Sequence, residues 1–224
     1  MSVALITGAS RGIGRATALR LAKDHEIIAV ARSRPDLESL CAQIAAAGGK
    51  CRTIPLDLAD HATTGQALAG IDCDVLVNNA GVGPIKPFLE LTSEEWHRIV
   101  DLNFSALFHV TKAVLPGMVR RGRGHVIVVG SIAGRSAFVG GTAYAASKHA
   151  AAAFAESLML EVRDRGVKVS VINPGSVATD FSRKPDPSWM LSADDVAASI
   201  AHIIATPAGV LVHSVEIRAA NPKK

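Results

Sequence analysis

Long hydrophobic runs are absent from this sequence. No apolar stretch approaches the roughly 20 residues that a membrane-spanning helix needs. The first apolar run, Val3–Ile6, is too short for the hydrophobic region of a signal peptide. We therefore expect a soluble, cytoplasmic protein with no membrane partner.

Cysteine is scarce and histidine is scattered. The three cysteines, Cys41, Cys51 and Cys73, have no CxxC or other metal-type spacing. Three cysteines cannot all pair within one chain, so we expect reduced, mostly structural thiols in a reducing compartment. The eight histidines form no HExxH motif or ligand cluster. No metal site is expected.

An excess of charge of one sign is also missing. The formal net charge is +4 and the pI is about 9.1. The one basic cluster, at Arg120, Arg121 and Arg123, is short and typical of a solvated loop. A nucleic-acid surface would need more basic residues on one face, so no nucleic-acid partner is expected.

What the chain does contain suits one large α/β unit. Hydrophobic residues make up 49% of its 224 residues, whereas aromatic residues make up only 4%. A chain of this length can bury a sizeable core without disulfides or metals. With no repeat and no low-complexity linker, residues 1–224 are predicted to form a single domain.

Short β-branched runs alternate with longer helical segments along the whole chain. The predicted strands are Val3–Thr7, Glu26–Ala31, Cys51–Leu56, Val75–Asn78, His125–Val129, Val167–Ile172 and Val212–Arg218. The predicted helices are Ile13–Asp24, Asp36–Ala47, one opening at Thr92, Leu102–Met118, Tyr144–Arg165 and one from Ser192 to about Thr206. The near-continuous hydrophobicity of the strands suits a parallel sheet covered on both faces. We predict a doubly wound, Rossmann-type, mostly parallel seven-stranded sheet with helices on both faces.

A glycine-rich turn follows the first predicted strand. Gly8 permits the tight turn, Gly12 lets the backbone approach a phosphate, and Gly14 lets the helix pack close to the strand. The helix that follows presents unpaired N–H groups to a pyrophosphate.

The spacing of these glycines is GxxxGxG rather than GxGxxG. With this motif the chain resembles the short-chain dehydrogenase/reductase family, whose glycine motif is TGxxxGxG. Further matches follow in the family's order: Asn78-Asn79-Ala80-Gly81, Asn103, Ser131, Tyr144-x-x-x-Lys148 and Pro174-Gly175. The resemblance covers Val3 to about Thr179. It implies hydride transfer between NADP(H) and a ketone or aldehyde, or the corresponding secondary alcohol.

Four side chains are expected to carry the chemistry. Tyr144 and Lys148 lie at i and i+4 of a helix, where they are neighbours. We expect Tyr144 to act as general acid/base, with its pKa lowered by Lys148, and Ser131 to bind the substrate oxygen. The resemblance implies that Lys148 also binds the nicotinamide ribose and that Asn103 holds a water beside the lysine. The alternatives are a half-buried core tyrosine with an exposed lysine, a turn serine and a helix-surface amide.

The resemblance also assigns the cofactor contacts. Asp57 and Leu58 should border the adenine, although a turn or capping aspartate is the plain alternative. The expected cofactor residues are Gly8, Ser10, Arg11, Gly12, Ile13, Gly14, Arg32, Ser33, Asp57, Leu58, Asn79, Ala80, Gly81, Tyr144, Lys148, Pro174, Gly175, Val177 and Thr179.

The end of the second strand predicts NADP(H) rather than NAD(H). NAD-type sites place an acidic residue here to accept from the ribose 2′-hydroxyl. This chain has Arg32 and Ser33, and no carboxylate before Asp36. Arg32 and Arg11 can both meet a 2′-phosphate.

Other activities stay open at this point. A 3-oxoacyl-carrier-protein reductase is one alternative, and a non-catalytic NADP-binding regulator is another. A sugar-nucleotide epimerase also carries YxxxK, but such chains are usually longer. The substrate cannot be read from the sequence, although a short substrate loop at about residues 180–191 predicts an open entrance for small carbonyl compounds.

A homodimer is expected, with a homotetramer as the alternative. Leu102–Met118 carries more apolar surface than one sheet contact needs, and Tyr144–Arg165 adds an alanine-rich face. The family commonly pairs these helices across a two-fold axis. The alternative is that both helices bury this surface within one subunit. The ending, which lacks the family's frequent Asp-Gly-Gly, argues against the carrier-protein reductase and the tetramer.

Overall fold

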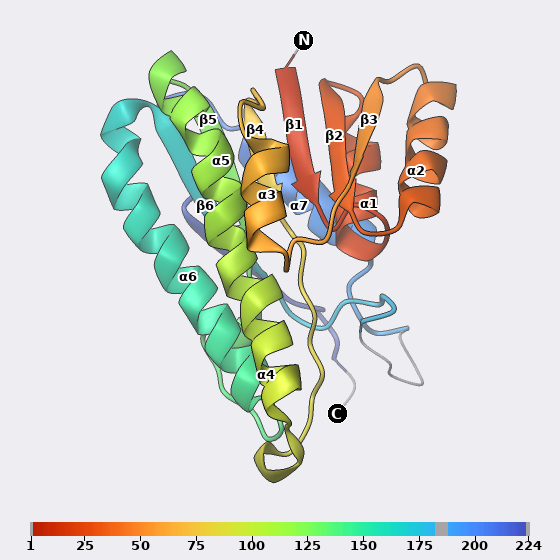
Figure 1. The fold of residues 1–224 in the computed structure, drawn as a ribbon, viewed down its shortest axis with the longest axis vertical. Helices are drawn as coiled ribbons and strands as arrows, with labels where there is room; N and C mark the ends of the chain where they lie inside the picture. The colour runs from red at the N-terminus through yellow and green to blue at the C-terminus, as the bar shows by residue number, and fades with distance from the viewer. Residues whose placement is uncertain (1, 182–187, 223–224) are drawn as a thin grey trace.

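One seven-stranded sheet forms the centre of the molecule in this computed structural model (Figure 1), which describes residues 2–181 and 188–222. The strands are β1 (Ser2–Thr7), β2 (His25–Ala31), β3 (Cys51–Pro55), β4 (Val75–Asn78), β5 (Gly124–Val129), β6 (Val167–Pro174) and β7 (Ser214–Ile217). They lie in the order β3-β2-β1-β4-β5-β6-β7, and every neighbouring pair is parallel. The predicted doubly wound parallel sheet is confirmed.

Helices cover both faces of this sheet. They are α1 (Gly12–Leu21), α2 (Arg34–Ala46), α3 (His61–Leu68), α4 (Ser93–Val100), α5 (Ala106–Arg121), α6 (Thr142–Val162) and α7 (Ala193–Ile204). Short helical turns are η1 (Phe88–Glu90), η2 (Asp101–Ser105, a π-helix), η3 (Ile132–Gly134) and η4 (Arg163–Arg165). In Figure 1, α3, α5 and α6 lie in front of the sheet and α1, α2 and α7 behind it.

The two faces have separate cores because side chains alternate along each strand. In β1, Ala4 and Ile6 pack with α1, α2 and α7, whereas Leu5 packs with α3, α5 and α6. All three side chains are completely buried. Strands covered on both sides in this way have no solvent face, which explains their continuous hydrophobicity.

Helix starts are fixed by local polar side chains. Thr92 and Glu95 form a capping box at the start of α4, as do Ser192 and Asp195 at α7. Asp60 caps α3, a helix for which the sequence offered no strong pattern. The predicted Leu102–Met118 helix instead begins as the π-helix η2, and regular α5 runs three residues further to Arg121.

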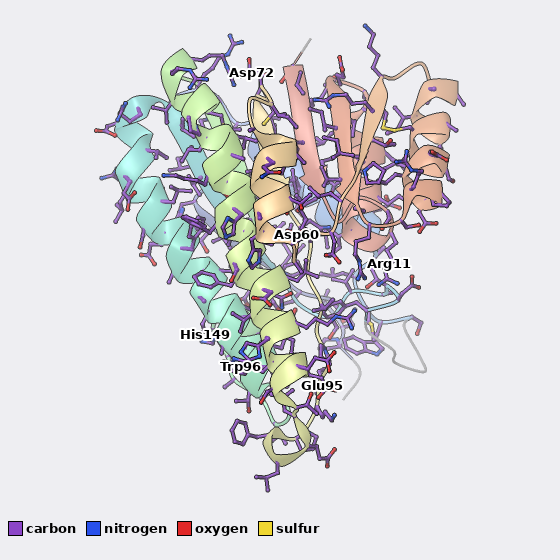
Figure 2. All side chains as sticks on the ribbon, viewed as in Figure 1. Arg11, Asp60, Asp72, Glu95, Trp96 and His149 are labelled. Carbon is purple, nitrogen blue, oxygen red and sulfur yellow. A yellow bond between two sulfur atoms is a disulfide. The ribbon has the colours of Figure 1, made fainter. Side chains whose placement is uncertain are left out.

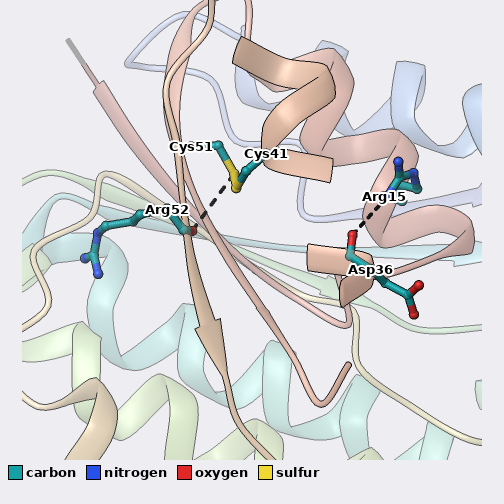
Figure 3. Close-up of a disulfide and its surroundings, with 5 residues drawn as sticks. All are labelled: Arg15, Asp36, Cys41, Cys51 and Arg52. Atoms are coloured by element: carbon teal, nitrogen blue, oxygen red, sulfur yellow. Dashed lines mark hydrogen bonds between the residues drawn. A yellow bond between two sulfur atoms is a disulfide. The ribbon is translucent and has the colours of Figure 1, made fainter. Parts of the chain in front are cut away.

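The cysteine prediction is wrong for two of the three residues. Cys41 on α2 and Cys51 on β3 form a disulfide, with their Cα atoms 5.1 Å apart (Figure 3). The pairing arises because α2 turns back at Gly48–Gly49 and the chain enters β3 beside it. Cys73 is a free, buried thiol, as expected.

The basic cluster lies at the end of α5 and in the turn after it, where Arg120 and Arg123 are exposed as expected and Arg121 is partly buried. Arg121, in the last turn of α5, pairs with Asp72 and donates to the Cys73 carbonyl at 2.7 Å. Arg123 lies 3.4 Å from Asp74. These two cations therefore hold α5 and β5 to the loop before β4.

Candidate active site

A cleft of about 700 Å³ runs along the carboxyl ends of the strands, where doubly wound sheets bind ligands. Its wall contains these predicted residues: Gly8, Ser10, Arg11, Gly12, Ile13, Arg32, Ser33, Asp57, Leu58, Asn79, Ala80, Gly81, Ser131, Tyr144, Lys148, Pro174, Gly175, Val177 and Thr179. The structure thus brings together residues up to 171 positions apart. Gly14 and Asn103 are not in this wall.

Contacts around the glycine turn explain why Gly8 and Gly14 have no room for a side chain. Gly8 has a φ of +66°, and a Cβ there would lie 2.8 Å from the amide nitrogen of Asn79. A Cβ on Gly14 would overlap the carbonyl oxygen of Gly8. Asn79 donates from this same nitrogen to the carbonyls of Thr7 (2.9 Å) and Gly8 (3.3 Å), so it joins the ends of β4 and β1. Gly14 therefore serves close packing behind the turn, as predicted.

The start of α1 is suited to an anion. Arg11 occupies the N-cap position but makes no capping hydrogen bond to the first turn, so it does not satisfy those N–H groups. Gly12, at a φ of +53°, leaves the backbone open on the cleft side, where the nearest atom to an added Cβ belongs to Thr179 at 3.4 Å. Uncapped N–H groups and the helix dipole together suit a pyrophosphate.

Two arginines frame the end of the cleft beyond β2. The exposed guanidinium of Arg32 lies 3.9 Å from a carboxylate oxygen of Asp57, and that of Arg11 lies 3.7 Å from Asp180. Figure 2 shows Arg11 projecting from below the strands toward the loops. Ser33 caps α2 by accepting from the Asp36 N–H at 3.4 Å, so its own hydroxyl proton can still be donated. This end of the cleft can receive a 2′-phosphate.

Asp57 takes the turn role that was the plain alternative. One of its oxygens accepts from the Ala59 N–H at 3.1 Å, and the other faces Arg32. Both Asp57 and Leu58 still line the cleft. The adenine contact stays a prediction.

Ser131 and Tyr144 meet at the other end of the cleft. Ser131 lies two residues after β5 and caps η3, accepting from the Ala133 N–H at 3.1 Å. Tyr144 lies in the first turn of α6, and Ser131 is near enough to its hydroxyl to act on the pKa of Tyr144. Both hydroxyl groups therefore lie where one carbonyl oxygen could contact them.

The predicted effect of Lys148 on Tyr144 is not what the structure shows. Burial raises the pKa of Tyr144, and the hydrogen bond from Ser131 lowers it. The Lys148 ammonium lies over the tyrosine ring, 5.9 Å from its centroid, and donates to the Val129 carbonyl at 3.0 Å. Burial lowers the pKa of Lys148 to about 8. The lysine is thus buried rather than exposed, and it contacts backbone rather than the phenol.

Asn103 is buried, so the helix-surface alternative is wrong. Its side-chain oxygen accepts from the Val82 N–H at 2.7 Å, and its nitrogen donates to the Val82 carbonyl at 2.8 Å and the Ser147 hydroxyl at 3.0 Å. Ser147 in turn donates to the Tyr144 carbonyl at 2.8 Å. Ser147 was not predicted from the sequence, because no motif marks a serine between Tyr144 and Lys148 as functional.

A second cavity, of about 10 Å³, lies behind Lys148. Asn103, Asn78 and Thr7 are among its lining residues. A space of roughly this size holds one water molecule when polar groups surround it. A Cβ on Gly81 would lie 3.1 Å from the Asn103 side-chain oxygen and 3.8 Å from the Lys148 nitrogen, so a small residue keeps this region open.

Among residues 2–181 and 188–222, no three His, Cys, Asp or Glu side chains are arranged to hold a metal ion. In the same ranges no helix is both long and apolar enough to cross a membrane.

Fold and cleft together define a dinucleotide-binding protein of the doubly wound class. Residues 2–188 match the short chain dehydrogenase family. The chain belongs to this family, as the motifs predicted, and it is accordingly an oxidoreductase.

Named relatives are similar over nearly their whole length. The chain is 35% identical to the 3-oxoacyl-(acyl-carrier-protein) reductase FabG of Salmonella typhimurium, with 97% of this chain and 87% of that protein covered. It is 32% identical to the NADP-dependent 3-hydroxy acid dehydrogenase YdfG of Salmonella typhi, covering 96% and 94%. An alcohol dehydrogenase from the archaeon Thermococcus sibiricus, complexed with 5-hydroxy-NADP, superposes with a TM-score of 0.92 at 30% identity and full coverage of both chains.

Proposed function

We propose that this chain is an NADP(H)-dependent oxidoreductase that reduces a ketone or aldehyde, or oxidises the matching secondary alcohol, with Tyr144 as its general acid/base. One observation carries the proposal. Ser131, Tyr144 and Lys148 meet at one end of a cleft whose other end presents Arg32 and Ser33. NADP-binding relatives of the same fold support the choice of cofactor.

Each residue has a role in the reaction that follows from its position in the cleft. The cofactor supplies the hydride. Ser131 donates a hydrogen bond from its hydroxyl to the substrate oxygen and stabilises the charge that develops there. Tyr144 delivers its phenolic proton to the same oxygen, and its raised pKa keeps the phenol protonated at neutral pH. Lys148, Asn103 and a water in the small cavity would return a proton to the phenol.

Replacing Tyr144 with Phe tests the acid. This change removes only the hydroxyl, and general acid catalysis typically contributes about 10²–10⁴-fold, so kcat for ketone reduction should fall by that factor. The NADPH dissociation constant and Tm should stay near those of the wild type, which shows that the fold is intact. Near-native turnover by the purified variant would contradict the assignment.

The 3-oxoacyl-carrier-protein reductase stays an alternative because a relative at 35% identity carries that name. Comparing kcat/KM on a carrier-bound 3-oxoacyl group with kcat/KM on the free ketone separates the two. A non-catalytic regulator would bind NADPH tightly and turn over neither.

We propose a homodimer through α5 and α6. Phe108 on α5 and Leu160 on α6 are both exposed large apolar side chains. Part of the apolar surface is used within the subunit, where Phe104 meets Phe154 edge to face at 6.5 Å. Light scattering at micromolar concentration should give twice the chain mass, and Phe108→Asp should halve it. A monomeric wild type would refute the dimer.

The location of the protein stays a prediction. A cytoplasmic site is expected from the sequence, and fractionation of the producing cell, with an antibody against the chain, would test it.

A further inference from the structure

Three consecutive residues after β6 cross the cleft. The methyl group of Thr179 lies beside Gly12, and the carboxylate of Asp180 lies 3.7 Å from Arg11. Phe181 reaches the opposite wall, where its ring centroid is 5.7 Å from that of Tyr144. An aromatic side chain is thus held directly beside the catalytic phenol.

The wall opposite is shaped for this ring. A Cβ on Gly83 would overlap the end of the Phe181 ring and would lie 3.1 Å from the Tyr144 ring. Only glycine at this position lets the two aromatic rings and the backbone come together. Even so, Phe181 is 47% exposed, so one part of its surface is packed while another remains open to the cleft.

Further apolar side chains are exposed on the segments after Gly83 and before Gly140. Ile85, two residues after Gly83, is 66% exposed and lies beside Gly140, and Phe138 on the same loop is 41% exposed. The charged residue nearest to Ile85 along the chain, Lys86, is held by both carboxylate oxygens of Glu95 at 2.9 Å. The exposed side chains that directly follow Gly83 along the chain are thus apolar, and the lysine beside them is paired.

We propose that the open surface of Phe181 binds an apolar arm of the substrate, so that the preferred substrates are ketones or aldehydes with an aryl or extended alkyl group next to the carbonyl. This inference rests on the proposed function. Covering the exposed surface of an aromatic ring with a second apolar surface is favourable, because both surfaces are removed from water. A carboxylate on the same arm would lose part of its hydration against the apolar ring, which is unfavourable.

The test compares three methyl ketones with NADPH: acetophenone with an aryl arm, acetone with none, and acetoacetate with a charged arm. For the wild type, kcat/KM should be highest for acetophenone. Phe181→Ala should lower kcat/KM for acetophenone about tenfold or more, mainly through KM, and should change that for acetone by less than about threefold. Phe88→Ala is the matched control, since Phe88 is also exposed but lies outside the cleft wall.

Two further variants keep the test decisive. Gly83→Ala should displace the ring and reproduce the loss on acetophenone. Phe181→Leu, which keeps an apolar side chain, should give a smaller loss. NADPH binding by fluorescence verifies that each variant is folded.

Contrary results are distinguishable. If the wild type favours acetoacetate, or if Phe181→Ala lowers all three substrates alike, the apolar-arm inference is wrong while the reductase function stands. If the wild type reduces no carbonyl at all, the proposed function fails and the inference fails with it.

Discussion

Cofactor choice can be tested at Arg32. Replacing Arg32 with Asp removes the cation that faces the expected 2′-phosphate and installs the carboxylate that NAD-type sites use. A charge-assisted hydrogen bond contributes about 1.5–3 kcal/mol when shielded from water. Because the Arg32 side chain is 59% exposed and shares its charge with Asp57 at 3.9 Å, we take about 1 kcal/mol for its loss.

The new carboxylate adds a second effect. A like charge about 4 Å from a phosphate at the protein surface costs on the order of 1 kcal/mol in water. Together these effects give about 2 kcal/mol, or a shift of roughly thirtyfold in the ratio of kcat/KM for NADPH to kcat/KM for NADH. Arg11 keeps its own contact, so the variant should retain some NADPH use.

The assay measures kcat/KM for both cofactors with one ketone at saturating concentration. Arg34→Asp is the matched control: it makes the same charge change two residues away, where Arg34 faces Glu38 at 4.0 Å and does not line the cleft. That variant should leave the ratio within about threefold of wild type, because exposed charges are screened over such distances. Equal use of both cofactors by the wild type, or equal shifts in the two variants, would refute the reasoning.

Three further outcomes are expected. Gly14→Ala should lower stability by about 1–3 kcal/mol in denaturant unfolding and weaken NADPH binding, because its Cβ would overlap the Gly8 carbonyl; an unchanged midpoint would argue against this packing role. Burial lowers the pKa of His125 to about 4, below its unfolded value of 6.5, so protonation favours the unfolded chain as the pH falls. The free energy of unfolding should therefore drop by about 1.6 kcal/mol between pH 6.5 and 5 through His125, and His125→Gln should remove that part of the pH dependence if the interpretation holds. Replacing Cys41 and Cys51 with Ser should cost about 2–3 kcal/mol under oxidising conditions only, whereas an equal cost under reducing conditions would implicate packing instead.

The sheet could be predicted because its signal is local and repeated. The five inner strands are short, largely apolar runs that end at or just before a polar or glycine position, and burial on both faces leaves little polar alternation to confuse the pattern. The edge strands β3 and β7 carry exposed polar residues. Helix α3 was missed because His61–Leu68 has no strong apolar stripe and depends on the Asp60 cap and on packing against α5. The disulfide was missed for a similar reason. Nothing in the spacing of Cys41 and Cys51 reveals that α2 and β3 lie side by side.

The roles of cleft residues could be predicted where a sequence motif is required by a particular backbone conformation. Gly8 is required by its positive φ and by Asn79 beside it, and Gly14 by the carbonyl of Gly8. Arg32 follows a strand end that sequence alone can locate. Electrostatics were less predictable. The i, i+4 spacing of Tyr144 and Lys148 implies that they are neighbours, but not that the ammonium turns to the Val129 carbonyl. The direction of the pKa shift at Tyr144 depends on burial, which no spacing encodes.

The least predictable feature is the connection that holds the catalytic helix in place. Asn103 binds the backbone of Val82 on one side and Ser147 on the other, and Ser147 binds the carbonyl of Tyr144. Asn103 can do this because it lies in a π-helix, where the extra residue per turn changes the direction of the side chains that follow. Val82 is itself followed by Gly83, whose missing side chain leaves room for Phe181 beside Tyr144. The side-chain amide of Asn103 thus links the position of Tyr144, the proton donor, to that of Phe181, the expected substrate contact. A change at Asn103 should therefore disturb proton transfer and substrate preference together.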